Sequence, residues 1–256
     1  MSRWAFGAAS VRGISHVRRD TRIQDAKRCF EAKTSAESSV FCAVVSDGAG
    51  SASHGGEGAS LICRTIAENL RSYFAAGSAG LPSEEVVWDW VDEARDKIAV
   101  AASRRELTPR DFAATLVMAV TTGSQTFTAH IGDGAIVGRR VFDQEWQLLS
   151  ASENGEYAST TFFLTDPGTP RLRTSIADSP IDALFLFSDG IENQVLDAVS
   201  GEPYANFFTP MARPFEKSET FGRDHKLSER LSTYLDSEKF AEHTDDDKTL
   251  IIAVKK

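Results

Sequence analysis

The stretch Val40-Phe41-Cys42-Ala43-Val44-Val45-Ser46-Asp47-Gly48-Ala49-Gly50 decides the fold. Six apolar residues run without a break from Val40 to Val45 and stop at Ser46-Asp47-Gly48. A short apolar run that ends at a turn signal is typical of a strand buried on both faces. We therefore expect the carboxylate of Asp47 where a core strand emerges. The glycines after it allow the backbone to turn sharply and to approach a ligand closely.

The same arrangement of an apolar run and an aspartate occurs three more times. Residues 183–187 are apolar and lead into Ser188-Asp189-Gly190, and residues 126–131 lead into Gly132-Asp133-Gly134. The order is reversed near the end of the chain, where Thr244-Asp245-Asp246-Asp247 precedes the apolar run 249–254. Carboxylates at the ends of four core strands predict an acidic pocket that binds metal ions.

Composition limits the class of protein and its partners. The chain has 256 residues and a formal net charge of −9, which argues against nucleic acid or an anionic membrane as a partner. Its three cysteines are odd in number and irregularly spaced, which favours free thiols in a reducing cytosol over a zinc site. No apolar run reaches the ~18 residues that span a membrane, and residues 1–4 lack a signal-peptide segment. We expect a soluble, cytoplasmic protein.

The first half of the chain predicts strands followed by two helices. Strands are expected at residues 4–10 and 27–32, before the central strand. Apolar residues then recur at the helical period from Ala59 to Tyr73 and again from Val86 to Ile98. Ser83 is the expected N-cap of the second helix. The two helices are expected to lie antiparallel on one face of a sheet.

The second half predicts mostly strands. They are expected at residues 113–121, 125–131, 135–141, 146–149, 161–165, 172–176 and 183–187. The separators 122–124, 132–134 and 143–144 are short enough for hairpins, which predicts an antiparallel meander. Helices are expected at residues 191–198, 204–211 and 228–234, and a last strand at 249–254. We interpret residues 1–256 as one α+β domain with antiparallel sheets at its centre and helices outside.

Aspartate pockets without histidine or cysteine select hard cations such as Mg²⁺, Mn²⁺ and Ca²⁺. The EF-hand spacing is absent, which argues against a calcium loop. Clustered aspartates repel each other unless cations neutralise them. Two cations bridged by Asp47 and a water would make that water nucleophilic and would also clamp a phosphoryl group. Asp-Gly is a common turn signal, so Asp47, Asp133 or Asp189 alone is more often a turn residue, but their joint pattern favours a site.

The chain resembles the metal-dependent Ser/Thr protein phosphatases of the protein phosphatase 2C (PPM) type, especially their compact bacterial members. Six segments in family order carry this resemblance, which covers nearly the whole chain. They are Gly13-Ile14-Ser15-His16 through Gln24-Asp25-Ala26, Val45-Ser46-Asp47-Gly48-Ala49-Gly50, Phe112-Ala113-Ala114-Thr115, Ile131-Gly132-Asp133-Gly134, Phe187-Ser188-Asp189-Gly190-Ile191 and Asp246-Asp247-Lys248-Thr249.

The resemblance implies a fold and a role for each aspartate. The fold is an α/β sandwich of two packed antiparallel sheets flanked by α-helices, with two or three Mn²⁺ or Mg²⁺ ions in a cleft at one end. Asp47 would bridge two cations, and the carbonyl of Gly48 would bind one of them. Asp189 and Asp246 would hold the first cation and, with Asp47, form the catalytic set. Asp25 would help the second cation, and Asp133 would bind a third, weaker one.

The sequence departs from the family at the first acidic pair and at the arginine that holds the substrate phosphate. Gln24 replaces the first acid of the pair, which weakens the expected hold on the second cation. Asp20 stands where many relatives have the arginine. His16, Arg18 and Arg19 are therefore the candidate residues for the substrate phosphate, and the sequence does not choose among them.

Two further departures concern the general acid and the third cation. Ala49 stands where eukaryotic relatives have a histidine, so His16, His54 or a metal-bound water is left to protonate the leaving group. Asn193 stands where an aspartate often supports the third cation.

We interpret the protein as a bacterial-type phosphatase that hydrolyses phosphoserine and phosphothreonine in the substrates of a cognate Ser/Thr kinase. One alternative is a catalytically weak pseudophosphatase that binds a kinase or phosphoprotein, and another is a metal-dependent phosphatase of small phosphoesters. Residues 150–170 are long for a connection and are expected to border the cleft. Glu156 and Tyr157 within them are expected to affect peptide preference.

Overall fold

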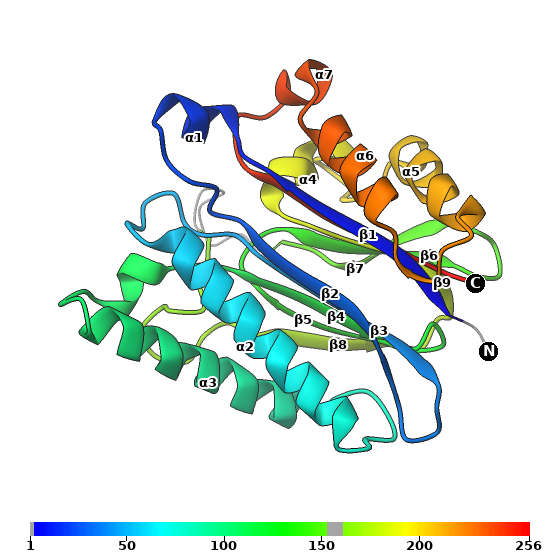
Figure 1. Ribbon diagram of the computed structural model, residues 1–256, viewed down its shortest axis with the longest axis horizontal. Coiled ribbons are helices and arrows are strands. Elements are labelled where there is room, and N and C mark those ends of the chain that lie inside the picture. The colour runs from blue at the N-terminus through cyan, green and yellow to red at the C-terminus, as the bar shows by residue number, and fades with distance from the viewer. Residues whose placement is uncertain (1–2, 153–160) are drawn as a thin grey trace.

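The computed structural model describes residues 3–152 and 161–256 of the chain, in which two β-sheets lie face to face between helices (Figure 1). The first sheet has the strand order β10-β1-β11-β9-β6-β7, and the second has the order β2-β3-β4-β5-β8. Paired strands are antiparallel, except that β10 runs parallel to β1. The expected pair of antiparallel sheets flanked by helices is confirmed.

The strands of the first sheet are β1 (Trp4–Val11), β6 (Ala135–Arg140), β7 (Trp146–Ser150), β9 (Ile181–Phe187), β10 (Gly222–Arg223) and β11 (Lys248–Lys255). Those of the second are β2 (Ala26–Lys33), β3 (Ser39–Ser46), β4 (Leu116–Thr121), β5 (Thr126–Ile131) and β8 (Arg173–Ala177). The helices are α1 (Ile14–Arg18), α2 (Gly55–Ala75), α3 (Glu84–Ser103), the 3-10 helix η1 (Pro109–Phe112), α4 (Asp189–Val195), α5 (Ala205–Lys217), α6 (His225–Leu235) and α7 (Glu238–Ala241).

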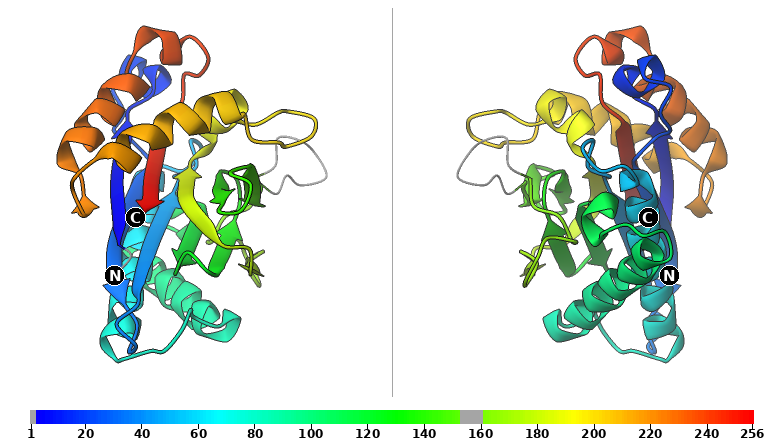
Figure 2. Two further views of the ribbon diagram at one scale, coloured as in Figure 1. Left: turned by 90° about the vertical axis from the view of Figure 1, so that its right-hand side faces the viewer. Right: turned by 90° about the vertical axis from the view of Figure 1, so that its left-hand side faces the viewer.

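Helices cover the outer face of each sheet (Figure 2). α2 packs on β2 and β3, and α3 runs beside α2 in the opposite direction (Figure 1). α5 and α6 cover the first sheet along β1 and β11. The Oγ of Ser83 accepts a hydrogen bond from the Val86 N–H at 3.4 Å, so the predicted N-cap of α3 is confirmed. No helix within the described residues is long and apolar enough to cross a membrane.

Burial on both faces explains the two unbroken apolar runs. In β3, Val40, Cys42 and Val44 pack under α2 and α3. The alternating residues Phe41, Ala43 and Val45 pack between the two sheets. β9 divides in the same way, with Phe185 and Phe187 toward α5 and with Leu184 and Leu186 between the sheets. Successive side chains of a strand point to opposite faces, so a strand covered on both sides is apolar throughout.

The predicted meander is wrong at residues 132–134. These residues do not close a hairpin; they cross from β5 in the second sheet to β6 in the first. Gly132 and Gly134 have φ angles of +91° and +89°, a region that glycine adopts without steric cost. A Cβ on Gly132 would lie 2.5 Å from the carbonyl oxygen of Phe162, so a side chain does not fit there. The crossing places Asp133 between the ends of the two sheets.

The predicted strand at residues 161–165 is also wrong. This segment forms an irregular turn, because its N–H groups bond to local or isolated partners rather than to a neighbouring strand. The N–H of Phe163 donates to the carboxylate of Asp166, and the N–H of Leu164 donates to the carbonyl of Ala114. Short elements that the sequence did not predict are α1, η1, β10 and α7.

Candidate metal centre

Five aspartates converge where strands of both sheets end. Asp47 follows β3, Asp133 lies in the crossing from β5 to β6, and Asp189 follows β9 as the first residue of α4. Each of these three offers a carboxylate oxygen, and the three oxygens lie within 4.8 Å of one another. Asp25 precedes β2, and its carboxyl group faces that of Asp47. Asp246 precedes β11 and acts electrostatically on Asp133 and Asp189.

The crowded carboxyl groups resist ionisation. Burial raises the pKa of Asp25 to about 6, and burial together with the charges of Asp133 and Asp246 raises that of Asp189 to about 8. The pKa of Asp47 lies well above its ordinary value because the group is buried beside Asp25 and Asp189. Carboxylates so placed are stable in the ionised form only if a positive charge joins them.

The donor set of this centre fits hard cations. The Oδ1 atoms of Asp25, Asp133 and Asp189 are buried and accept no hydrogen bond from any described residue. A buried polar atom without a partner is costly, and carboxylate oxygens are the ligands that Mg²⁺ and Mn²⁺ prefer. The three buried oxygens are therefore available as ligands for divalent cations.

Asp47 is fixed by a loop from another part of the chain. Its N–H donates to the Oγ1 of Thr115 at 3.0 Å, and its carbonyl accepts from the Thr115 N–H at 2.8 Å. Gly48 follows at a point where backbones nearly touch, because a Cβ there would lie 2.2 Å from the carbonyl carbon of Gly55. Thr115 thus aligns the bend that carries the carboxylate, and Gly48 is required for that bend to pack against the start of α2.

Asp25 is held by a buried network of hydroxyl groups. The Oγ of Ser188 donates to Oδ2 of Asp25 at 2.7 Å, and the Thr249 N–H donates to the same Oγ at 3.1 Å. The hydroxyl of Thr249 continues the network to Ser10 at 2.7 Å. Ser188 follows β9 and Thr249 lies in β11, the two central strands of the first sheet, so the network ties Asp25, which precedes β2 of the second sheet, to the first sheet.

The Asp133 loop is held from three sides. The Oγ1 of Thr161 donates to Oδ2 of Asp133 at 2.8 Å, and the ring of buried His130 lies 3.1 Å from the Asp133 carbonyl oxygen. Glu192 on α4 accepts from the Gly134 N–H at 3.3 Å. Glu192 rather than Asn193 therefore faces this loop, and Asn193 is exposed. Burial raises the pKa of Glu192, and the charge of Asp133 adds to this effect.

Asp247 is a buried anchor that the sequence analysis did not identify. Its carboxylate accepts hydrogen bonds from the N–H of Gly13 at 2.7 Å and from that of Gln24 at 2.6 Å. Nδ1 of His16 lies 2.9 Å from Oδ1 of Asp247, although the two are not aligned for a linear hydrogen bond. Asp247 thereby closes residues 13–24 into a loop beside the aspartates. The signals in the sequence were its place in a run of three aspartates and in the last of the six segments that resemble the family.

The residues considered for the substrate phosphate and for the general acid occupy different surroundings. His16 is buried against Asp247. Arg18 and Arg19 are exposed at the end of α1, on the loop that Asp247 anchors, and neither forms an ion pair within the described residues. His54 immediately precedes α2 and stacks on Phe112 with ring centroids 5.1 Å apart. Glu156 and Tyr157 lie outside the described residues.

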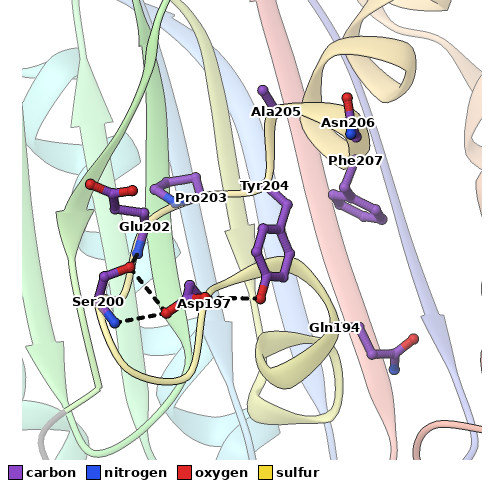
Figure 3. A pocket seen from close by; sticks show the side chains of 9 residues that line it. All are labelled: Gln194, Asp197, Ser200, Glu202, Pro203, Tyr204, Ala205, Asn206 and Phe207. Atoms are coloured by element: carbon purple, nitrogen blue, oxygen red, sulfur yellow. Dashed lines mark hydrogen bonds between the residues drawn. The ribbon is translucent and has the colours of Figure 1, made fainter.

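A surface hollow lies at the C-terminal end of α4, whose first residue is Asp189, and Figure 3 shows the side chains that line it. It has a volume of about 540 Å³, and its lining includes Gln194, Glu202, Tyr204 and Phe207. Asp197 at its edge accepts hydrogen bonds from its own loop and from the Tyr204 hydroxyl at 3.4 Å. These bonds occupy the carboxylate of Asp197, which does not belong to the group of Asp47, Asp133 and Asp189.

Comparisons with known proteins agree with this geometry. The family model described as "Protein phosphatase 2C" matches residues 12–236. "Serine/threonine-protein phosphatase 3" of Escherichia coli (strain K12) is 32% identical over 252 residues, which are 98% of this chain and 98% of that protein.

Solved structures share the fold at low sequence identity. The catalytic domain of the serine threonine protein phosphatase PstP, in complex with two manganese ions, superposes with a TM-score of 0.67 at 15% identity, over 100% of this chain and 99% of that one. The phosphatase Stp1 from Staphylococcus aureus gives a TM-score of 0.62 at 15% identity, over 97% and 94%.

Proposed function

Because the chain belongs to the protein phosphatase 2C family, we propose that its five-aspartate centre hydrolyses phosphoserine and phosphothreonine in proteins. Membership of this family shows that the protein is a metal-dependent serine/threonine phosphatase. The observation that carries the assignment to this centre is the set of three buried carboxylate oxygens, on Asp25, Asp133 and Asp189, that no described residue satisfies.

The proposed ligands follow from these positions. Asp47 would bridge two cations, with the carbonyl of Gly48 beside it; Asp189 and Asp246 would hold the first cation and Asp25 the second. When bound, divalent cations would make a water nucleophilic and neutralise the charge of the phosphoryl group. Thr115 keeps the bend at Asp47 in place, and Ser188 orients the carboxylate of Asp25.

The identity and number of the cations belong to the proposal. Ligand sets made only of oxygen atoms bind Mn²⁺ and Mg²⁺ with modest affinity, so that these ions exchange with solution. A third cation at Asp133 would be held through Oδ1, which no described residue satisfies, because Oδ2 already accepts a hydrogen bond from the hydroxyl of Thr161. Arg18 and Arg19 are the proposed cationic contacts for the substrate phosphate, because His16 already faces Asp247.

The proposed substrates are phosphoproteins of a cognate Ser/Thr kinase, and the proposed setting is the cytoplasm. Support for a reducing compartment comes from Cys29, Cys42 and Cys63, which form no disulfide. Burial raises the pKa of the Cys29 thiol to about 11, which keeps it protonated and unreactive.

Release of phosphate from a phosphothreonine peptide tests the proposal. We expect turnover with Mn²⁺ or Mg²⁺, loss of turnover in EDTA, and recovery when Mn²⁺ is added back. A protein that binds the phosphopeptide without turnover would instead be the pseudophosphatase. Faster turnover of a nucleotide or sugar phosphate than of the peptide would identify a phosphatase of small phosphoesters.

A further inference from the structure

A pocket rich in cationic side chains lies where α5, β10 and α6 meet. It has a volume of about 580 Å³. We call it the basic pocket, and the charged or titratable residues that line it are Lys217, Arg223, Asp224, His225, Lys226 and Arg230. Four full positive charges thus surround one carboxylate, on a chain whose net charge is −9. This local excess of positive charge is the opposite of the charge of the whole molecule.

The four cations of the basic pocket are exposed and form no ion pair with the part of the chain that the structure describes. Within the described residues, no carboxylate lies within 4.0 Å of the charged atoms of Lys217, Arg223, Lys226 or Arg230, and all four side chains are exposed. By contrast, Arg139 on the same sheet pairs with two carboxylates. The pocket therefore presents unneutralised charge to solvent.

The one carboxylate of the basic pocket is already used by the fold. Asp224 caps α6 by accepting from the Leu227 N–H at 3.0 Å, and it also accepts from the Ser218 hydroxyl at 2.6 Å. Burial raises the pKa of Asp224, but these hydrogen bonds outweigh burial and lower it below its usual value. The N-terminus of α6 is consequently closed by its own anion. A compact anion placed at the helix end would meet the negative charge of Asp224.

The basic pocket is remote from the metal centre. β10 pairs with Ala5 and Phe6 at the start of β1, whereas the other end of β1 leads to Gly13 and the aspartates. Six residues of strand separate Ala5 from Val11, which is about 20 Å. Figure 1 shows α1 and the start of α6 at opposite ends of the first sheet. A ligand in the basic pocket is therefore not in contact with the aspartates.

We propose that the basic pocket is a docking surface for an acidic segment of the phosphoprotein substrate, several residues away from the phosphorylated side chain. The proposal rests on the function proposed above, since it names a feature of the substrates of that site. Cations on three elements around Asp224 suit a run of several Asp and Glu residues, because separate carboxylates can pair with separate cations. Charges at the rim of an interface mainly increase the association rate and make binding sensitive to salt.

Direct binding is measured with an unphosphorylated, fluorescein-labelled 12-residue peptide of alternating Glu and Ser, by anisotropy at low salt. The variant is Lys226→Glu/Arg230→Glu. Its control, Arg104→Glu/Lys239→Glu, changes the net charge equally at two exposed residues, one directly after α3 and one on α7. We expect about tenfold weaker binding in the variant, less than twofold in the control, and loss of wild-type binding at ~1 M salt.

Turnover is measured with two phosphothreonine peptides, one of which carries an acidic run about eight residues from the phosphothreonine. An extended chain of eight residues reaches roughly 26–29 Å, which exceeds the ~20 Å length of β1 along which the two sites are separated. We expect the variant to raise KM for the acidic peptide alone, without changing kcat or the hydrolysis of an aryl phosphate. If the variant is unstable by thermal unfolding, Lys226→Gln/Arg230→Gln replaces it.

Four outcomes would overturn the docking surface. The first is that the control binds the peptide as weakly as the variant, and the second is that an equal concentration of inorganic phosphate displaces the peptide. The other two are that the wild-type protein binds anionic lipid vesicles, or associates with itself, and that the variant has lost this property. Failure of the proposed function looks different, because the wild-type protein would then bind the acidic peptide and hydrolyse no phosphopeptide.

Discussion

The carboxylate of Asp47 is surrounded by those of Asp25, Asp133 and Asp189, and its replacement gives the sharpest test at the residue scale. Asp47→Asn keeps the shape of the side chain and removes the charge that would hold two cations. We expect a loss of transition-state stabilisation of several kcal/mol, and each ~1.4 kcal/mol is tenfold in rate. The measurement is kcat with saturating Mn²⁺ on a phosphothreonine peptide.

Asp189→Asn is the companion variant, and we expect it to lower kcat nearly as much. Asp236→Asn is a matched control, because Asp236 is an exposed aspartate that follows α6 and lies outside the five-aspartate centre. Near-normal turnover in folded Asp47→Asn would mean that Asp47 is only a turn residue. That result would also remove the basis of the proposed mechanism.

Asp247 is expected to contribute to stability rather than to cation binding. Asp247→Ala leaves the N–H groups of Gly13 and Gln24 without an acceptor in a buried site, so we expect the free energy of unfolding to fall by about 2–4 kcal/mol. Asp247→Asn retains one acceptor oxygen and should lose less. Urea unfolding in EDTA measures both. The control is Asp245→Ala, whose side chain is exposed two residues away.

If Asp247→Ala changes the free energy of unfolding by less than ~0.5 kcal/mol, water replaces the carboxylate as the hydrogen-bond acceptor without cost. The loop of residues 13–24 would then be held by its other contacts. Among these is the bond from the Ser15 N–H to the Asp245 carbonyl, at 2.9 Å.

At the scale of elements, strands and long helices were predictable because their signals are local. The unbroken apolar runs of β3 and β9 indicated strands buried on both faces, and the periodic apolar positions of α2 and α3 indicated helices buried on one face. The crossing at residues 132–134 was not predictable in this way. A short Gly-Asp-Gly separator fits a hairpin equally well, and the choice depends on which strands β5 and β6 meet elsewhere.

The contacts that position the aspartates were also not predictable, because they join residues that are far apart in the sequence. Thr161 contacts Asp133 across 28 residues, and Asp247 contacts Gly13 across 234. Neither pair follows from spacing along the chain. Four of the aspartates, Asp47, Asp133, Asp189 and Asp246, were found because each stands at or near the end of an apolar run, whereas Asp25 was found only through the family resemblance.

The packing of α2 on η1 gives a prediction at the element scale. A Cβ on Gly58 would lie 2.0 Å from the carbonyl oxygen of Phe112, so the helix approaches η1 closely at this residue. We expect Gly58→Ala to lower the free energy of unfolding by about 1–3 kcal/mol, because the clash outweighs the ~1 kcal/mol gain in helix propensity. Activity should fall as well, since Thr115, which holds Asp47, follows Phe112 closely.

The control for this variant is Gly80→Ala, where a Cβ has no neighbour within 4 Å. Thermal unfolding of both variants in EDTA separates crowding from the general effect of replacing glycine. Stabilisation of the protein by Gly58→Ala would contradict the close approach of α2 to η1.

At the scale of the whole molecule, the centre depends on both sheets together. Asp25 and Asp47 flank strands of the second sheet, Asp189 and Asp246 flank strands of the first, and Asp133 lies in the crossing between them. The apolar layer between the sheets sets the separation of these carboxyl groups. The fold therefore holds together charges that repel each other, and cation binding and folding are thermodynamically linked.

This linkage predicts how stability depends on pH. The pKa of Asp189 is about 8 in the folded protein against 3.8 in the unfolded chain, so between these values the folded state binds more protons than the unfolded state. The free energy of unfolding of the metal-free protein should therefore fall as pH rises from about 4 to about 8. Asp25, with a folded pKa of about 6, adds to the fall in the lower part of this range.

The measurement is the thermal midpoint in EDTA and in Mn²⁺ from pH 5 to pH 8. We expect Mn²⁺ to raise the midpoint most at pH 8, because cations replace the protons that the carboxylates have lost. Asp189→Asn carries no titrating group at this position, so in EDTA its midpoint should rise above that of the wild type by an amount that grows with pH. If the difference in thermal midpoint between the two proteins stays constant from pH 5 to pH 8, burial and the neighbouring charges do not raise the pKa of Asp189. The aspartates would then lie farther apart in solution than their positions at the strand ends imply.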